Sequence, residues 1–287
     1  MLAHRSCKDQ DDPMTDETSK PQDDTSTSAP ADDAQQESVQ NESVQNESAQ
    51  ATPSVADEAV ARKRGIKSYV IRGGRMTQAQ TRGLEEVFPR LGLRHEQGEL
   101  DLEALFGRRA PLVIEVGFGM GKSLCEQAQA NPGTDFIGIE VHAPGVGKLL
   151  DDVDKLGLTN LRVYRHDALE VLADCVPAGC ADTFQLFFPD PWPKKKHHKR
   201  RIVQPAFVEL VRRVLKPGGH FHMATDWENY AEAMAEEMAE APGFVNTAPA
   251  ESAPYVPRPD FRPLTKFEQR GERLGHGVWD LIFVKQD

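Results

Sequence analysis

Three carboxylates in this sequence each stand at the end of a short apolar run, a spacing that suits the binding of one cationic ligand. Glu115 lies in the run 112–116, Glu140 closes the run 136–140, and Asp167 follows a third run. Apolar runs of this length are typical of buried strands, and the carboxyl ends of parallel strands form the ligand-binding edge of an open sheet. One such acid alone is adequately explained as a solvated cap on a strand or helix. Three together predict a binding site.

The residues after Glu115 sharpen this prediction because they are rich in glycine, as in Gly117-Phe118-Gly119-Met120-Gly121. Glycines permit a tight turn and let a ligand lie against the backbone. A dinucleotide fold has the spacing GxGxxG, and an acid two residues before its first glycine would repel the pyrophosphate. S-adenosylmethionine instead carries a sulfonium and an ammonium. We therefore predict S-adenosylmethionine rather than a nicotinamide cofactor, with Glu140 accepting from the ribose hydroxyls and Asp167 from the adenine amino group.

A fourth carboxylate, Asp190, lies in the loop Phe188-Pro189-Asp190-Pro191-Trp192-Pro193. The flanking prolines restrict the backbone and lack N–H groups, so the loop presents the carboxylate rigidly. In the expected fold this loop faces the transferable methyl group. A proline-rich loop alone is an ordinary turn, but an Asp and a Trp within it favour substrate recognition.

The next stretch, 194–201, reads KKKHHKRR and holds six permanent cations in eight positions. Beside a cofactor site in an otherwise neutral domain, this run favours a polyanion. A second basic run, 62–75, has six Lys or Arg and no acid, with Tyr69 among them, which fits phosphate contact with base stacking. His197 and His198 lack a third ligand nearby, so we expect no metal site.

A regular framework of strands and helices must position these residues. The predicted strands are 112–116, 136–140, 161–165, 183–188, 220–225 and 278–286. Over 204–215 the apolar residues recur on one helical face, and Lys216-Pro217-Gly218-Gly219 is expected to end that helix and turn the chain into the next strand. Strands that alternate with helices indicate a doubly wound α/β fold of the Rossmann-like class, with a mostly parallel sheet.

The negative charge of the chain is concentrated in residues 1–60, which contain 14 Asp or Glu against three Lys or Arg; the other residues hold 31 of each. This tail lacks Phe, Trp and Tyr, and it repeats ESVQN between Glu37 and Gln50. A polar repeat with a period of five has no face to bury. We predict a disordered acidic tail, 1–60, and a methyltransferase domain, 61–287, so the acidity of the whole chain does not argue against nucleic acid.

We expect a cytoplasmic protein without membrane contact. The opening residues MLAHRSCKDQDD contain no apolar leader region, and no long charge-free apolar stretch follows. The cysteines, Cys7, Cys125, Cys175 and Cys180, form no CxxC pair and no cluster with histidine. Free thiols in a reducing compartment are the simplest interpretation.

Five segments of the chain resemble the bacterial tRNA (guanine-N7-)-methyltransferase family: EVGFGMG, GIEVHAPGVGKLL, FPDPWPKKKHHKRR, LKPGG and RPLTKFEQRGERLGHGVWDL. The segment SYVIRGGRMT is also similar to the N-terminal part of that family. The resemblance covers roughly residues 62–287, and the block around Asp190 is far more specific than the glycine loop. It implies methyl transfer from S-adenosylmethionine to N7 of a guanine in the variable loop of tRNA.

By this resemblance Glu115, Glu140, Asp167 and Asp190 contact the cofactor, and Asp190 is also the catalytic residue. Substrate contacts are implied for Lys194, Asp226, Thr265, Lys266, Phe267 and Glu268, and RNA contacts for Lys196, His197, His198, Lys199, Arg200 and Arg201. Asp226 and Glu268 would accept from guanine N1–H and the exocyclic amine. Thr265 would donate to the base or to the cofactor's carboxylate, and the sequence leaves both open.

Guanine N7 carries a lone pair and no proton, so its methylation needs no general base. We therefore predict that Asp190 orients the guanine and favours the positive charge that the ring gains. The target base is expected to be partly extruded from folded tRNA. Two other classes remain open: a methyltransferase for a small molecule or protein, and an RNA-binding module without catalysis. Monomer and homodimer are also both open.

Overall fold

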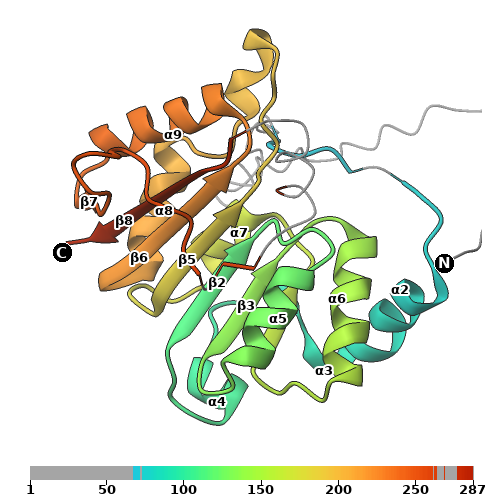
Figure 1. Ribbon diagram of the computed structural model, residues 1–287. Helices are drawn as coiled ribbons and strands as arrows, with labels where there is room; N and C mark the ends of the chain where they lie inside the picture. Colours follow the sequence, from blue (N-terminus) through green and yellow to red (C-terminus); the bar gives the residue numbers. More distant parts are fainter. Residues whose placement is uncertain (1–66, 72, 261, 264–267, 269–276, 287) are drawn as a thin grey trace, which may run out of the picture. The chain divides into compact units, whose positions relative to one another are not determined.

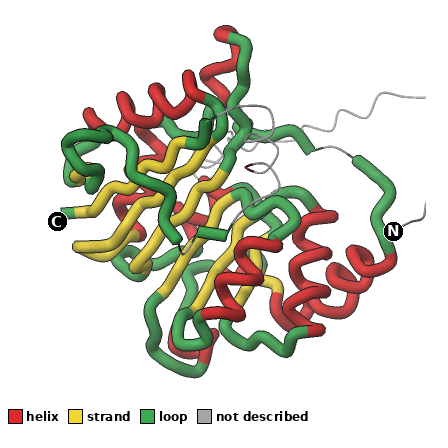
Figure 2. The backbone as a smooth tube through the Cα atoms, viewed as in Figure 1, coloured by secondary structure: helices red, strands yellow, loops and turns green. Residues whose placement is uncertain are grey.

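Eight strands form one sheet in the part of the chain that the structure, a computed structural model, describes: residues 67–71, 73–260, 262–263, 268 and 277–286. The strand order is β1-β4-β3-β2-β5-β6-β8-β7 (Figures 1 and 2). The strands are β1 Gly92–Leu93, β2 Leu112–Val116, β3 Asp135–Ile139, β4 Leu161–Tyr164, β5 Ala181–Phe187, β6 Leu215–Thr225, β7 Phe244–Asn246 and β8 Trp279–Lys285. The predicted acidic tail, 1–60, lies outside the described residues.

Strands β1 to β6 are parallel, and β8 runs antiparallel to both β6 and β7. β2 and β5 are neighbours at the centre of the sheet. From them the strand order runs outward in opposite directions, through β3 and β4 on one side and through β6 on the other. Open α/β sheets bind ligands at such a reversal, beyond the carboxyl ends of the strands. The predicted doubly wound, mostly parallel fold is confirmed.

The helices cover both faces of this sheet. They are α2 Gln78–Arg82, the π-helical turn η1 Gly83–Val87, α3 Phe88–Leu91, the 3-10 turn η2 His95–Gln97, α4 Leu102–Phe106, α5 Lys122–Ala130, α6 Ala143–Lys155, α7 Ala168–Asp174, the 3-10 turn η3 Lys195–Arg200, α8 Pro205–Val214 and α9 Glu228–Glu240. Successive strand residues such as Phe136 and Ile137 belong to two different apolar cores, because side chains alternate across a sheet. One core includes residues of α5 and α6, which lie side by side in Figure 1, and the other includes residues of α7, α8 and α9.

The predicted strands and the helix over 204–215 are confirmed within a few residues, but the segment Lys216–Gly219 differs from the expected turn. β6 begins at Leu215, directly after α8. Ala181 pairs with Leu215, whereas Thr183 pairs with His220, so the extra residues form a bulge inside β6. Gly218 has φ +78°, a conformation that favours glycine. The Lys-Pro-Gly-Gly sequence therefore shapes the start of a strand instead of separating two elements.

The helical segment α2-η1-α3 packs closely against α6 through glycines. A Cβ added at Gly83 would lie 1.8 Å from the carbonyl oxygen of Gly147, and one added at Gly147 would lie 2.1 Å from the carbonyl oxygen of Gln80. Neither position has room for a side chain. The two backbones can approach this closely only because both contact residues are glycine.

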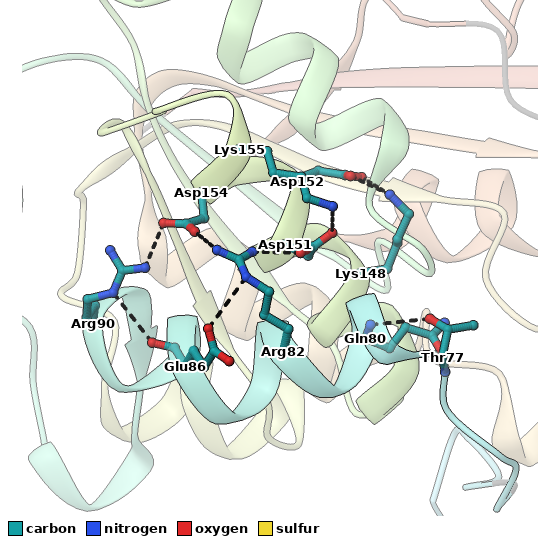
Figure 3. Close-up of polar contacts among 10 residues, drawn as sticks. All are labelled: Thr77, Gln80, Arg82, Glu86, Arg90, Lys148, Asp151, Asp152, Asp154 and Lys155. Atoms are coloured by element: carbon teal, nitrogen blue, oxygen red, sulfur yellow. Dashed lines mark hydrogen bonds and ion pairs between the residues drawn. The ribbon is translucent and has the colours of Figure 1, made fainter.

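Charged groups fix the same contact (Figure 3). The Arg82 guanidinium donates to the buried carboxylate of Asp151 at 2.7 Å and also pairs with Asp154. Arg90 donates to Asp154 at 2.6 Å. The hydrogen bonds from both arginines lower the pKa of Asp154. This network holds the helical segment α2-η1-α3 in place. Residues 67–71 precede that segment, so the chain on their C-terminal side is fixed.

We expect Gly147→Ala to lower the free energy of unfolding by about 2 kcal/mol, because the new methyl group overlaps the Gln80 backbone. Gly133→Ala is the matched control, since a Cβ at Gly133 meets no atom within 4 Å. Urea denaturation of both variants measures the effect. Equal stability of the two variants would contradict the close packing.

Candidate active site

The glycine loop after β2 adopts the backbone that its sequence predicts. Gly117, Gly119 and Gly121 have φ of +75°, +58° and +73°. The loop is held against the neighbouring strand, because Gly117 N donates to Ile139 O at 2.8 Å. A Cβ at Gly117 or Gly119 would meet no atom within 4 Å. The backbone at these two glycines is therefore open to a ligand.

Glu115, on β2 just before this loop, is a buried carboxyl group with an unsatisfied oxygen. The residue is only 3% exposed, and its Oε2 has no hydrogen-bond partner in the described part of the protein. Burial, with a smaller contribution from the charge of Glu140, raises the pKa of Glu115 to about 8. The group is mostly protonated at pH 7 in this state. A cation bound nearby would favour its ionised form.

Glu140, the last residue of the predicted strand, directly follows β3, and its carboxylate is held by backbone amides. Oε2 accepts from Gly119 N at 2.9 Å, and Oε1 accepts from Val141 N at 2.7 Å and His142 N at 2.9 Å. These contacts fix the carboxylate at the carboxyl edge of the sheet and tie it to the glycine loop. Each oxygen has two lone pairs, so one lone pair, on Oε2, remains for the predicted ribose contact.

Asp167 caps the N-terminus of α7 and also contacts the chain far upstream. Its Oδ1 accepts from Leu169 N at 2.9 Å, and its Oδ2 accepts from Lys67 Nζ at 2.6 Å and from the Tyr69 hydroxyl at 3.1 Å. Burial disfavours the charge, but hydrogen bonds from Lys67 and Leu169 N hold the pKa of Asp167 below its ordinary value. The same ion pair raises the pKa of Lys67. The sequence did not predict this role for Lys67 and Tyr69.

Asp190 is exposed in the loop after β5, between two residues with unusual backbone conformations. Phe188 has φ +49° and Trp192 has φ +46°. Non-glycine residues adopt this region only when their surroundings hold them there. Phe188 N donates to Ala224 O at 2.8 Å, which attaches the start of the loop to β6.

These residues surround one cleft of about 190 Å³. Its walls come from the residues that follow β2, β3, β4 and β5, and Ser68 and Tyr69 close one side. Glu140, Asp167 and Asp190 line the cleft, and the unsatisfied Glu115 precedes it in the chain. Several carboxylates with few cationic partners suit a ligand that carries positive charge and hydroxyl or amine donors. The residues present therefore fit S-adenosylmethionine.

The basic stretch continues from the Asp190 loop into η3, and two of its residues hold it to residues 67–69. The Arg200 guanidinium lies 3.9 Å from the centre of the Trp192 ring. It donates to Lys67 O at 3.1 Å and Tyr69 O at 3.0 Å, and the Trp192 indole donates to Ser68 O at 3.0 Å. Arg200 and Trp192 thus fix the segment that closes the cleft.

The other cations of the stretch divide into exposed and buried ones. Arg201 is 4% exposed; it donates to Pro191 O at 3.0 Å and to the Asn229 side chain at 2.9 Å, and it lies over the Tyr230 ring. This position does not support the predicted RNA contact of Arg201. His197 and His198 are half-buried. The lysines Lys194, Lys195, Lys196 and Lys199 are exposed, and no carboxylate of the described residues pairs with them.

The remaining predicted contacts lie near the same edge or outside the described residues. Asp226 is half-buried and follows β6 directly. Glu268 is buried, and its carboxylate accepts from Arg262. Thr265, Lys266 and Phe267 lie outside the described residues, as do the cations at 62–66 and Arg72.

Two features are absent from the described residues. No cluster of His, Cys, Asp or Glu there is arranged to hold a metal ion. None of the helices there is long and apolar enough to span a bilayer.

We expect Glu115→Gln to stabilise the protein more at pH 8 than at pH 5. The pKa of Glu115 is raised in the folded state, so the unfolded chain loses this proton first, and wild-type stability falls as the pH rises from the ordinary glutamate range toward 8. A neutral amide does not incur this loss. Denaturation at both pH values measures the difference, with exposed Glu99→Gln as the control. An equal gain at both values would contradict the buried, raised-pKa carboxyl.

Comparison with solved structures supports the fold. The 16S rRNA methyltransferase KamB superposes with a TM-score of 0.50 at 20% identity, covering 66% of this chain and 95% of that one. At this identity the likeness concerns the fold alone.

Sequence comparison goes further. The protein family described as "Putative methyltransferase" matches residues 109–281. A tRNA (guanine-N(7)-)-methyltransferase of Chromohalobacter salexigens is 77% identical over 222 residues, which is 77% of this chain and 90% of that protein. The protein of the same name from Pseudoalteromonas atlantica is 61% identical over 222 residues, 77% of this chain and 92% of that protein. On these matches, and with the site described above, the chain belongs to the bacterial tRNA (guanine-N7-)-methyltransferase family.

Proposed function

We propose that this protein transfers a methyl group from S-adenosylmethionine to N7 of a guanine in the variable loop of tRNA. One arrangement supports the proposal. Carboxylates line a cleft at the carboxyl edge of the sheet, and the Asp190 loop connects this cleft to the exposed lysines that follow it in the sequence. The first feature suits a cationic cofactor and the second a polyanionic substrate. The names of the relatives agree with both.

Glu115, Glu140 and Asp167 would hold the cofactor, with the backbone of the glycine loop against it. Bound there, S-adenosylmethionine would supply to guanine N7 a methyl group carried on a positively charged sulfur, and the guanine ring would gain the positive charge that the sulfur loses. No proton leaves N7, so no side chain has to act as a base.

Asp190 is the residue that we assign to the reacting atoms. Its carboxylate is exposed at the mouth of the cleft on a loop fixed at both ends, by Phe188 N on β6 and by Trp192 on Ser68. A fixed negative charge there orients the guanine and stabilises the cationic ring as it forms. Both effects require the carboxylate to be in place before the reaction starts.

Lys194, Lys195, Lys196 and Lys199 would contact the tRNA backbone. Exposed lysines beside the reaction centre attract phosphates and recognise the shape of folded RNA more than its sequence. Arg200 and Arg201 support this surface from within by holding the loop. We place the reaction in the cytoplasm, in keeping with tRNA as the substrate.

We expect Asp190→Asn to lower the single-turnover rate of methyl transfer at least about 100-fold, because the amide keeps the shape but removes the charge. Labelled methyl transfer to unmodified tRNA, with identification of the product nucleoside, measures the rate. The affinity for tRNA should stay within about threefold of wild type. A variant that keeps a rate within threefold of wild type would show that Asp190 is not at the reaction centre.

We expect joint replacement of Lys194, Lys196 and Lys199 by alanine to weaken tRNA binding at least about tenfold at moderate salt. The slope of log affinity against log salt should fall by about 2 to 3, since each lost phosphate contact removes a little less than one. Cofactor affinity should not change. The control replaces Arg109, Lys122 and Lys155, exposed cations on other elements. Unchanged tRNA affinity in the triple-lysine variant would favour a small-molecule or protein substrate.

A further inference from the structure

Two buried oxygen atoms on neighbouring strands have no hydrogen-bond partner in the described part of the protein: Oε2 of Glu115 and Oε1 of Gln185. Glu115 is 3% exposed and Gln185 is 2% exposed. A buried acceptor without a partner is costly, so each of these oxygens needs an explanation. The proposed function uses Glu115 as a cofactor contact and assigns no role to Gln185.

The sheet places these two side chains next to each other. Glu115 on β2 and Gln185 on β5 are register partners in a parallel pair of strands. Their chain neighbours, such as Ile114 and Phe184, belong to the core with α7 and α8, so Glu115 and Gln185 project from the other face. Paired strands lie about 4.8 Å apart, and the two side chains have the same length. Their terminal oxygens are therefore close enough to share one proton.

The other neighbour of Glu115 in this row is Gly138 on β3, which has no side chain. A Cβ added at Gly138 would lie 2.7 Å from Leu124 and 2.8 Å from Phe118. Apolar groups thus fill the space on that side. Gln185 is the polar side chain that strand pairing brings to Glu115.

Contacts with helix α5 orient the Gln185 amide. Its Nε2 donates to Gln127 Oε1 at 2.9 Å, and Gln127 Nε2 donates to Ser123 Oγ at 3.4 Å. Because the N–H side of the Gln185 amide is used on α5, its carbonyl oxygen needs a donor from elsewhere. An ionised Glu115 has only acceptors to offer, which leaves both oxygens unpaired. A protonated Glu115 has one donor, and a single hydrogen bond then satisfies both oxygens.

The charged groups around Glu115 also favour its protonated form. Glu140 follows β3, and its negative charge adds to the effect of burial in raising the pKa of Glu115. On α5, Lys122 and Glu126 pair with each other at 3.1 Å on the exposed side of the helix. Neither member of that pair supplies an uncompensated positive charge to Glu115.

Two further titratable groups on the packed elements are neutral at pH 7. Burial raises the pKa of the Cys125 thiol on α5 to about 11. His222 on β6 is the register partner of Gln185, and it forms a hydrogen bond with Asp280 at 2.7 Å. Burial lowers the pKa of His222. These groups add no cation to the row that contains Glu115.

We propose that Gln185 is a positioning residue of the cofactor site: its Oε1 accepts the proton that Glu115 carries while the site is empty. As the cationic cofactor binds, the O–H bond of Glu115 breaks, its electron pair stays on the carboxylate, and the proton passes to solvent. Gln185 thereby sets how strongly the loss of this proton opposes binding. The cofactor step rests on the proposed function, whereas the shared proton is a property of the protein alone.

Carbon NMR of the wild-type protein without cofactor tests the pairing directly. The carboxyl carbon of Glu115, identified by its loss in Glu115→Gln, should titrate with a midpoint near pH 8. The side-chain amide of Gln185 should shift with the same midpoint. The amide of Asn160, which is buried and held by backbone carbonyls, is the control and should not shift. A Gln185 amide that does not follow Glu115 would overturn the proposal.

The variant Gln185→Met tests the direction of the hydrogen bond. Methionine keeps the bulk of the side chain but removes the acceptor that favours protonated Glu115, so the midpoint should fall by about 0.5 to 1 pH unit. If the Gln185 amide instead donated its N–H to an ionised Glu115, the same change would raise the midpoint. A rise, or no change, contradicts the proposal. If Gln185→Met does not fold, the wild-type titration decides alone.

Cofactor affinity provides a readout that a purely structural role would not give. We expect Gln185→Met to bind S-adenosylmethionine about three- to tenfold more tightly than wild type at pH 6.5, where Glu115 must lose its proton. At pH 9, where the proton is already lost, the two affinities should be equal. In the Glu115→Gln background, Gln185→Met should leave the pH dependence of binding unchanged.

Weaker binding by Gln185→Met at both pH values would show a structural role and overturn the proposal. A different result would concern the proposed function instead. If wild-type Glu115 and Gln185 titrate together but the protein binds no S-adenosylmethionine, the shared proton stands and the proposed cofactor is wrong.

Discussion

The structure depends on a buried carboxyl group, Glu115, whose Oε2 has no hydrogen-bond partner among the described residues. Parallel strands bring their carboxyl ends to one edge, where Glu115 lies near the end of β2 and Glu140, Asp167 and Asp190 follow β3, β4 and β5. Backbone amides hold Glu140, and Lys67 holds Asp167. Glu115 Oε2 has no hydrogen-bond partner among the described residues, and burial raises the pKa of Glu115 to about 8. A cationic ligand bound at this edge would favour the ionised form of Glu115.

The rest of the site is arranged around this edge. The N-terminal helical segment docks on α6 through Gly83 and Gly147, and the residues before it run across the cleft to Asp167. Trp192 and Arg200 then tie that segment to the Asp190 loop. As a result the wall of the cleft and the loop that carries Asp190 form one connected unit. The exposed lysines Lys194, Lys195, Lys196 and Lys199 follow that loop in the sequence, and a polyanion can approach them.

The parts of this site that depend on local sequence patterns could be predicted from the sequence alone. Strand ends are visible as apolar runs, so Glu115, Glu140 and Asp190 were placed at the correct edge. The fold class follows from the alternation of strands and helices. The glycine spacing and the charge of the loop together indicated a cation rather than a pyrophosphate.

Contacts between distant segments were not predictable in the same way. Lys67 and Asp167 are 100 residues apart, and nothing in the basic run distinguishes Lys67 from its neighbours. Likewise, Arg200 and Arg201 belong to the same run as the lysines, but tertiary packing turns them inward. Glu115 and Gln185 become neighbours only when β2 and β5 pair. Such pairings depend on the three-dimensional course of the chain, which composition and periodicity do not encode.

Cofactor binding should ionise Glu115, a buried carboxyl group whose raised pKa keeps it mostly protonated beforehand. Calorimetry of S-adenosylmethionine binding at pH 7, in buffers of different ionisation enthalpy, counts the protons released. Burial raises the pKa of Glu115 to about 8, and a cation bound nearby should lower it, so cofactor binding should release protons from the wild-type protein and fewer from Glu115→Gln. No proton release from wild-type protein, with cofactor bound, would contradict the account.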